Sequence, residues 1–159
     1  MSSNIFLARS SPEDFDRTVL SEVELSSYPD HPEAFSEMDT VRFFGAPESK
    51  KDTFEKMSTD DLVLFHQNGE YVGTGWIGIT FEDEQQWAGT KVWSDTSSTL
   101  IYTVQGVKPV SVPTTAVNRI FGYADGYTPL NLMRVAGSRV DSRPKAIKRA
   151  LEQYTEKHS

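Results

Sequence analysis

Hydrophobic residues along the chain fall into short runs separated by turn residues, a pattern typical of strands in a small sheet. The clearest run covers residues 62–65 (LVLF) and is apolar throughout, as in a buried strand. Asn68-Gly69 follows and predicts a tight hairpin, because both residues of such a turn must accept positive φ. A second strand is expected over residues 70–81, and it contains Gly73, Gly75 and Gly78.

Further apolar runs predict strands before and after this hairpin. They cover residues 4–9, 41–45, 99–105, 107–112 and 132–135. Gln105-Gly106 is expected to turn the chain between two of these strands. Pro109 indicates an edge strand or a bulge, because proline has no N–H to donate to a ladder.

Helix signals flank the strands. Ser10-Ser11 followed by Pro12 predicts a capped helix start, with helix continuing over residues 14–23. Residues 49–57 open with a capping box, and the acidic residues 82–84 indicate another helix start. Residues 113–121 predict a helix that stops at Gly122, and a last helix runs from Ser142 with one apolar face. Five or six strands with three or four helices indicate an α+β fold with a curved, barrel-like sheet.

Length and composition bound the protein class. A chain of 159 residues with 37% hydrophobic content is expected to form one domain with a real core. The absence of cysteine excludes disulfides, thiolate metal sites and a cysteine nucleophile. No apolar run approaches the roughly 20 residues that cross a bilayer, so a cytoplasmic protein is the simplest interpretation.

The formal net charge of −7 argues against a nucleic-acid partner, since phosphate binding normally requires a basic surplus. A local basic rim would still suffice. The candidate phosphate contacts are Arg42, Lys50, Lys51, Arg134 and Arg139, and plain solvation is the alternative for each.

Catalytic and cofactor motifs are weak. Residues 73–78 (GTGWIG) match GxGxxG, but the dinucleotide fingerprint needs a helix directly after its strand, and here the strand continues. His31, His66 and His158 are scattered without metal-ligand spacing. No nucleophile–base–acid set is legible. We therefore expect neither an enzyme nor a cofactor or metal site.

The order of segments resembles the PUA-like superfamily, in particular its EVE and YTH branches, over roughly residues 4–140. The segments that carry the resemblance are IFLARSS (5–11), VRFFG (41–45), DLVLF (61–65), GEYVG (69–73), the stretch with Trp87 and Trp93, and MRVAGSR (133–139). The sequence is also similar to the N-terminal specificity domains of archaeal restriction proteins of the McrB kind. An acidic, cysteine-free chain would suit a haloarchaeal member.

The resemblance implies a reader that holds a methylated or otherwise modified base, extruded from its stack, between aromatic rings. It places Phe44 where YTH domains carry a cage tryptophan, and Trp87 or Trp93 at the other cage positions. Arg139 takes the place of a backbone-contacting arginine. Ser11 replaces the YTH asparagine that contacts the base, so N6-methyladenine specificity is not implied.

The candidate site therefore has two parts. The modified-base contacts are Phe43, Phe44, Trp76, Trp87, Trp93, Ser10 and Ser11, and the backbone contacts are Arg9, Arg42, Lys50, Lys51 and Arg139. For the aromatic residues the alternative is ordinary core packing, and for the serines it is helix capping.

The functional hypothesis is a binding module for a modified base, in DNA more than in RNA, that targets a restriction or defence system whose nuclease or motor lies elsewhere. An ASCH-like small enzyme acting on RNA or modified nucleosides is the alternative, and a protein-interaction module using the last helix is another. Residues 1–141 are expected to form the PUA-like domain. Residues 142–159 are expected to form a helix that packs on it or leads to an effector domain.

Overall fold

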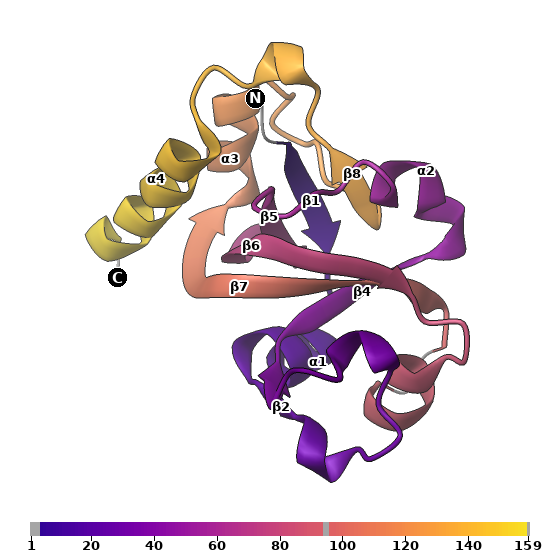
Figure 1. The fold of residues 1–159 in the computed structure, drawn as a ribbon. Helices are drawn as coiled ribbons and strands as arrows, with labels where there is room; N and C mark the ends of the chain where they lie inside the picture. Colours follow the sequence, from indigo (N-terminus) through magenta and orange to yellow (C-terminus); the bar gives the residue numbers. More distant parts are fainter. Residues whose placement is uncertain (1–3, 94–95, 159) are drawn as a thin grey trace.

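A six-stranded curled sheet organises the structure, a computed structural model that describes residues 4–93 and 96–158 (Figure 1). The strands lie in the order β4-β7-β6-β5-β1-β8, where β1 pairs in parallel with β5 and every other neighbour is antiparallel. Their bounds are Ile5–Arg9 (β1), Phe43–Pro47 (β4), Leu62–Gln67 (β5), Glu70–Glu82 (β6), Ser98–Pro113 (β7) and Leu132–Arg134 (β8). The α+β class and the curved sheet are thus confirmed.

Helices and two short strands lie around this sheet. The α-helices are Pro12–Phe15 (α1), Lys51–Phe54 (α2), Thr114–Phe121 (α3) and Pro144–Lys157 (α4). Asp16–Leu20 and Ala88–Val92 are π-helical, and Leu25–Ser27, Glu33–Phe35, Glu48–Lys50 and Gly137–Arg139 are 3₁₀ turns. Val23–Glu24 (β2) and Thr40–Val41 (β3) form a separate two-stranded sheet. No helix within residues 4–93 and 96–158 is long and apolar enough to span a membrane.

The central hairpin forms as its turn residues predict. Asn68 and Gly69 both have positive φ, at 44° and 84°, and they join β5 to β6. The strand predicted over residues 70–81 is confirmed as β6, Glu70–Glu82, and the GxGxxG stretch lies wholly inside it.

The turn predicted at Gln105-Gly106 is wrong. Residues before and after it belong to one long strand, β7, and both halves pair with β6, from Leu100 opposite Glu82 to Pro113 opposite Glu70. Gly106 takes a positive φ of 60°, and the β6–β7 register shifts nearby, between Thr74 and Trp76. The glycine therefore bends the strand and does not reverse it.

The helix predicted to start at residues 82–84 starts later. The Asp83 carboxylate accepts hydrogen bonds from the backbone N–H groups of Trp87 and Ala88, at 3.0 and 2.9 Å. The carboxylate thus caps a π-helical segment that begins a turn downstream. Two helix ends were predicted correctly: the Ser11 hydroxyl caps α1, and Gly122 ends α3 in the left-handed conformation.

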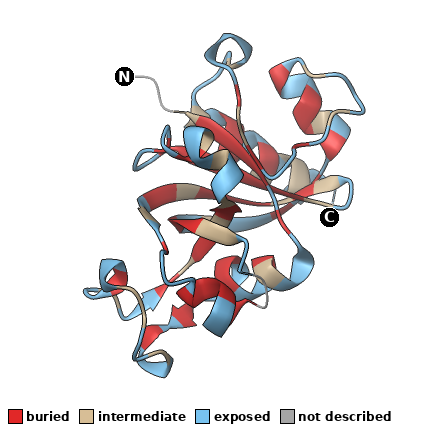
Figure 2. Ribbon diagram, turned by 90° about the vertical axis from the view of Figure 1, so that its right-hand side faces the viewer, coloured by how far each residue is buried: buried red, intermediate tan, exposed pale blue. Residues whose placement is uncertain are grey.

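The sheet separates two apolar clusters. Along β1, Phe6 and Ala8 face one cluster, while Ile5 and Leu7 face the other. Figure 2 shows the buried positions concentrated in the strands and the exposed ones on the surrounding helices and loops. Ile147 and Leu151 of α4 complete the second cluster, so this helix packs on the sheet beside β7. The functional division at residue 141 stays a prediction.

Candidate functional site

The aromatic side chains singled out from the sequence pack mainly on one another. Ring centroids of Phe43 lie 5.8 Å from Trp87 and 5.2 Å from Trp93, and Phe44 lies 5.8 Å from Trp93. None of these four side chains is more than 7% exposed. The three predicted cage rings, Phe44, Trp87 and Trp93, therefore lie in one buried aromatic cluster, and no open slot separates them. Their role in binding stays a prediction.

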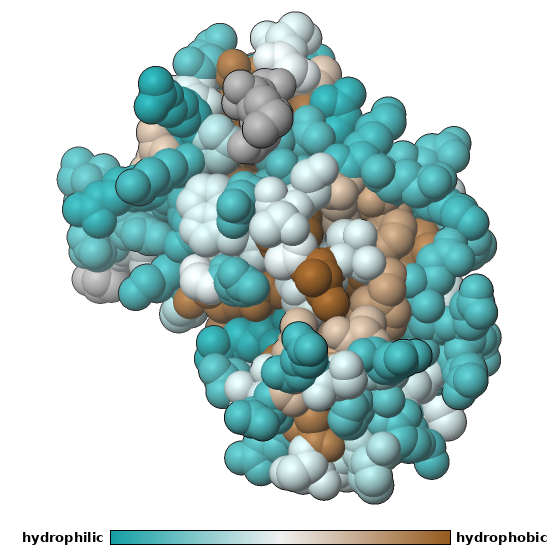
Figure 3. Space-filling view, viewed as in Figure 1, coloured by the Kyte–Doolittle hydropathy of each residue, from teal (hydrophilic) through white to brown (hydrophobic). Residues whose placement is uncertain are grey.

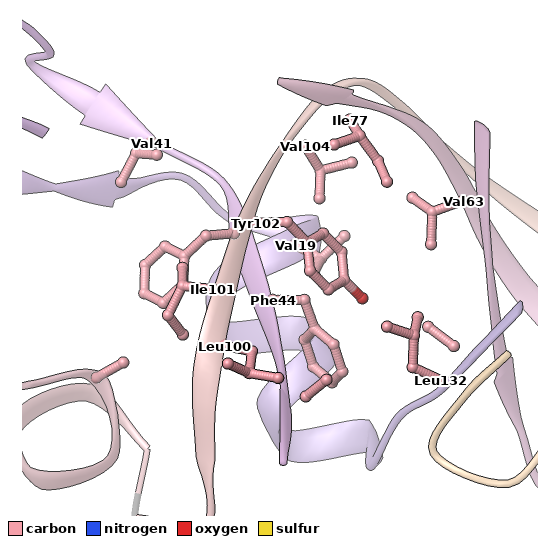
Figure 4. Packing of buried hydrophobic residues seen from close by; sticks show 14 of the residues in the cluster. Val19, Val41, Phe44, Val63, Ile77, Leu100, Ile101, Tyr102, Val104 and Leu132 are labelled. Atoms are coloured by element: carbon pink, nitrogen blue, oxygen red, sulfur yellow. The ribbon is translucent and has the colours of Figure 1, made fainter. Parts of the chain in front are cut away.

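One of these rings also borders a cavity. Phe44 lines a space of about 120 Å³ between the end of β1, the strand β4 and the middle of β7. Asp14, Tyr102 and Leu132 add to its lining, together with Ser11 and Asn131 at the end of β1. Figure 4 shows the hydroxyl end of Tyr102 pointing into the space between Phe44, Val63 and Leu132.

The Tyr102 hydroxyl has no hydrogen-bond partner within the described residues, and the side chain is fully buried. A buried hydroxyl left unpaired costs about 1–3 kcal/mol. Burial also raises the pKa of Tyr102, so the group stays a neutral donor and acceptor at any physiological pH. Phe44 and Tyr102 are thus among the residues that line the cavity, and the Tyr102 hydroxyl is an unpaired polar group buried beside it, so the cavity is a candidate ligand site.

An outer groove of about 560 Å³ adjoins this cavity. The two spaces share Arg9, Ser11 and Asn131 as lining residues. Arg9 is exposed and has no carboxylate within ion-pair distance among the described residues. An anionic group in the groove could therefore lie against its guanidinium.

Backbone and side-chain bonds fix the floor of the groove. The N–H of Ser10 donates to the carbonyl of His66 at 2.9 Å, and the Ser10 hydroxyl donates to the same oxygen. Burial, together with the charge of Arg9, lowers the pKa of His66, so its imidazole is neutral near pH 7. One of its nitrogens, Nε2, lies 2.8 Å from the Thr114 hydroxyl. Ser11 stays exposed, but its hydroxyl accepts from the Asp14 N–H as a helix cap.

Trp76 lies away from the other rings. It borders a separate cavity of about 860 Å³ at the opposite end of β1, near the start of α4. The structure therefore does not bring Trp76 to the cavity that Phe44 lines.

The remaining predicted cations also lie outside this cavity. Arg42 pairs with Glu22 at 3.5 Å, and Lys51 pairs with Glu82 at 2.9 Å, beside Lys50 on the same short helical segment. Arg139 stacks over the Tyr123 ring at 4.5 Å and donates to the carbonyls of Phe121 and Gly122. These side chains are mostly engaged within the protein.

The hollow beside Trp87 suits phosphate poorly. Its lining contains five carboxylates, from Asp30, Glu33, Glu82, Asp83 and Glu84. Nucleic acid would meet like charge there, whereas the groove at the end of β1 offers a free arginine. Electrostatics therefore favours the β1 end as the functional site.

Sequence reasoning missed Tyr102 and Asn131. Tyr102 lies in a strand whose pattern of apolar and polar residues does not decide on which face of the sheet its side chain lies. Asn131 takes positive φ, at 50°, and accepts from the Arg9 N–H at 2.7 Å. Asparagine ahead of a short strand was the available signal, because asparagine tolerates this conformation better than most residues.

The sequence matches no family profile and no curated protein. Solved structures do match. The N-terminal domain of Thermococcus gammatolerans McrB bound to m5C DNA aligns with a TM-score of 0.68 at 17% identity, over 96% of this chain and 99% of that one. The Mmi1 YTH domain aligns with a TM-score of 0.57 at 11% identity, over 98% and 79%. The YTH domain-containing protein mmi1 in an RNA complex gives 0.57 at 10%, over 99% and 86%. These likenesses establish the PUA-like fold.

Proposed function

We propose that this PUA-like domain is a reader, without catalytic activity, of a modified base in nucleic acid. The base leaves its stack, passes the groove at Arg9, and enters the cavity that Phe44 and Tyr102 line. The observation that carries this proposal is the cavity itself, which has Phe44 and Tyr102 in its lining and adjoins a polar groove.

The size of the cavity supports a single small ring as its occupant. A cavity of about 150 Å³ accommodates benzene in a well-packed protein, and the space here is about 120 Å³. The face of Phe44 would pack against the heterocycle, and Trp93 behind it would hold the phenylalanine ring in place. The Tyr102 hydroxyl would bond to a polar edge atom of the base.

The energetics are those of other base-extruding proteins. Extrusion costs a few kcal/mol, and each stacked base regains about 1–3 kcal/mol from an aromatic surface. An additional methyl group in a closely fitting cavity contributes a similar amount to discrimination. A modified base could therefore be selected without any chemical step.

We favour DNA over RNA as the partner. We favour a cytoplasmic archaeal restriction system as the setting, in which another chain or domain supplies the nuclease or motor. Support comes from the McrB domain, whose structure contains m5C DNA. The YTH domain-containing protein mmi1, which has a similar fold, forms a complex with RNA. Both nucleic acids therefore belong in the test.

The test is a titration of matched oligonucleotides at one stated salt concentration. Each sequence is made as DNA and as RNA, unmodified or with 5-methylcytosine, 5-hydroxymethylcytosine or N6-methyladenine. We expect one modified DNA to bind at least about 5-fold more tightly than its unmodified form. Equal, weak binding to every oligonucleotide would exclude modified-base recognition.

The variant Phe44→Leu locates the site. It removes the ring but keeps an apolar side chain, and we expect binding to fall roughly 5- to 150-fold, the loss of one stacked base. Phe121→Leu is the matched control, because Phe121 is also buried but lies in the other apolar cluster. If both variants bind alike, with both shown folded by thermal melting, the cavity at Phe44 is not the site.

A further inference from the structure

We propose a second site, which binds a nucleotide unit, in the 860 Å³ cavity between Trp76 and the start of α4. The function proposed above does not use this cavity. Its volume lies within the range of roughly 300–1,000 Å³ that small-molecule sites occupy. A partly exposed tryptophan, three cations and the position of the cavity support this assignment.

Trp76 is a partly buried side chain that could serve as a stacking surface. Part of its indole packs against the second apolar cluster, and the rest lines the cavity. Gly106 lies against the edge of the indole, where a Cβ would come within 3.1 Å of Trp76 Cδ1. Among the described tryptophans it alone is not buried, since Trp87 and Trp93 are 5% and 4% exposed. A flat heterocycle could stack on this surface without rearranging the core.

Three cations surround the same cavity. Arg134, Arg143 and Lys145 line it together with the carboxylates of Asp60 and Asp141, so the local balance is 3 − 2 = +1 in a chain of net charge −7. Within residues 4–93 and 96–158, none of the three cations has a carboxylate in ion-pair distance. Arg134 donates to the Asn4 side chain over 3.4 Å. These cations remain available for a phosphate.

The backbone adds donors at the same place. The helix α4 is 14 residues long and starts at Pro144, and no side chain caps its first turn. The first N–H groups of a helix lack partners inside it, and they favour an anion. A stacking face beside cations and free amides matches a nucleotide, in which a planar base and a phosphate are joined by a sugar.

The strand β1 separates the two sites. Asn4 and Ile5 border the new cavity, while Ala8 and Arg9 border the cavity at Phe44. At about 3.3 Å per residue, these two pairs of residues lie roughly 13 Å apart along the strand. A nucleotide in either cavity cannot reach the other, so the two proposals can fail independently.

The test uses two probes, adenosine 5′-monophosphate and an unmodified ten-residue DNA strand, followed by calorimetry or NMR titration. We expect wild-type protein to bind at least one of them. Trp76→Leu should weaken that binding roughly 5- to 150-fold, as should the double exchange Arg134→Gln/Arg143→Gln, which leaves the core intact. Binding of the mononucleotide identifies a free nucleotide as the ligand, and binding of the strand alone identifies nucleic acid.

Phe44→Leu is the control, because it should leave binding at Trp76 unchanged while weakening recognition of a modified base. Inorganic phosphate should bind more weakly than either probe, because it cannot stack. The proposal is overturned if both probes fail to bind at millimolar concentration. It is also overturned if the Trp76 and arginine variants bind as tightly as wild type.

Discussion

At the scale of single residues, two tyrosines provide a matched pair. Tyr71 and Tyr102 are both buried, and neither hydroxyl has a hydrogen-bond partner among the described residues. Burial raises the pKa of each well above its usual value, so both stay protonated. Only Tyr102 lines the cavity at Phe44; Tyr71 lies in the second apolar cluster.

We predict that Tyr102→Phe and Tyr71→Phe behave alike in stability but differ in binding. Removing an unpaired hydroxyl should leave the free energy of unfolding within about 1 kcal/mol of wild type, or raise it. Tyr102→Phe should weaken modified-base binding roughly 2- to 12-fold, the value of one neutral hydrogen bond. Chemical denaturation and oligonucleotide titration measure the two quantities. Loss of binding in both variants would place the effect in the core and not in the cavity.

Local chemistry made some residues predictable and left others undetermined. Ser11 and Gly122 act through backbone needs of a helix end, which depend only on neighbouring residues. Tyr102 could not be assigned, because facing in a strand depends on which neighbours the sheet brings, and those lie far away in sequence. For Phe44 the sequence indicated a ring at the site, and the structure places that ring beside the cavity.

At the scale of elements, the glycines of β6 allow side chains of the neighbouring strand β7 to pack directly against the β6 backbone. A Cβ on Gly75 would overlap Val104 Cγ1, and one on Gly78 would overlap the Thr103 hydroxyl. That hydroxyl accepts from the Ile79 N–H at 2.8 Å, which links the two strands. Figure 3 shows apolar side chains gathered in the middle of the molecular face seen in Figure 1, with hydrophilic residues around them.

We predict that Gly75→Ala destabilises the domain by about 1–3 kcal/mol, because an added methyl group would force Val104 or the backbone to move. The control is Gly126→Ala, where no atom lies within 4 Å of an added Cβ, and the change should stay within about 0.5 kcal/mol. Urea denaturation at constant pH gives both values. Equal stability of the two variants would show that β6 and β7 can separate locally at no measurable cost.

The incorrect prediction of a turn within β7 also reflects the contacts between β6 and β7. Glycine after glutamine predicts a turn from local sequence, but a positive φ at one residue is compatible with a bend as well as a reversal. Pairing of both halves of β7 with β6 decides between them, and that pairing spans residues 70–113. Tertiary contacts therefore overrode the local turn signal.

At the scale of the whole molecule, the acidic charge should appear in the salt dependence of binding. Among the candidate phosphate contacts, only Arg9 lines the groove of the first site, so a short oligonucleotide there should release about one counterion. We predict a slope of log K against log salt of about −1, and no steeper than about −3. Titration between low and moderate salt measures it. A slope near −6 would require a basic surface that the residues described at the groove do not present.

The fold could be predicted from the order of segments along the chain, but the burial of individual aromatic side chains could not. Apolar alternation and turn residues predicted the strands, and their sequence along the chain indicated the PUA-like fold. Whether a ring faces a core or a cavity depends on the space left by side chains from β1, β4, β7 and β8 together. Trp76 and Phe44 illustrate this, because both are aromatic residues on strands and they border different cavities.

The position of β1 between β5 and β8 has a consequence for folding during synthesis. Phe6 pairs with Val63 on one side and Arg134 on the other, so its second partner is translated 134 − 6 = 128 residues later. At roughly 5–20 residues per second, a ribosome takes about 6–26 s to make that stretch. During this time a strand with apolar side chains on both faces has an unpaired edge, which is the kind of transiently exposed surface that makes incomplete chains prone to aggregate.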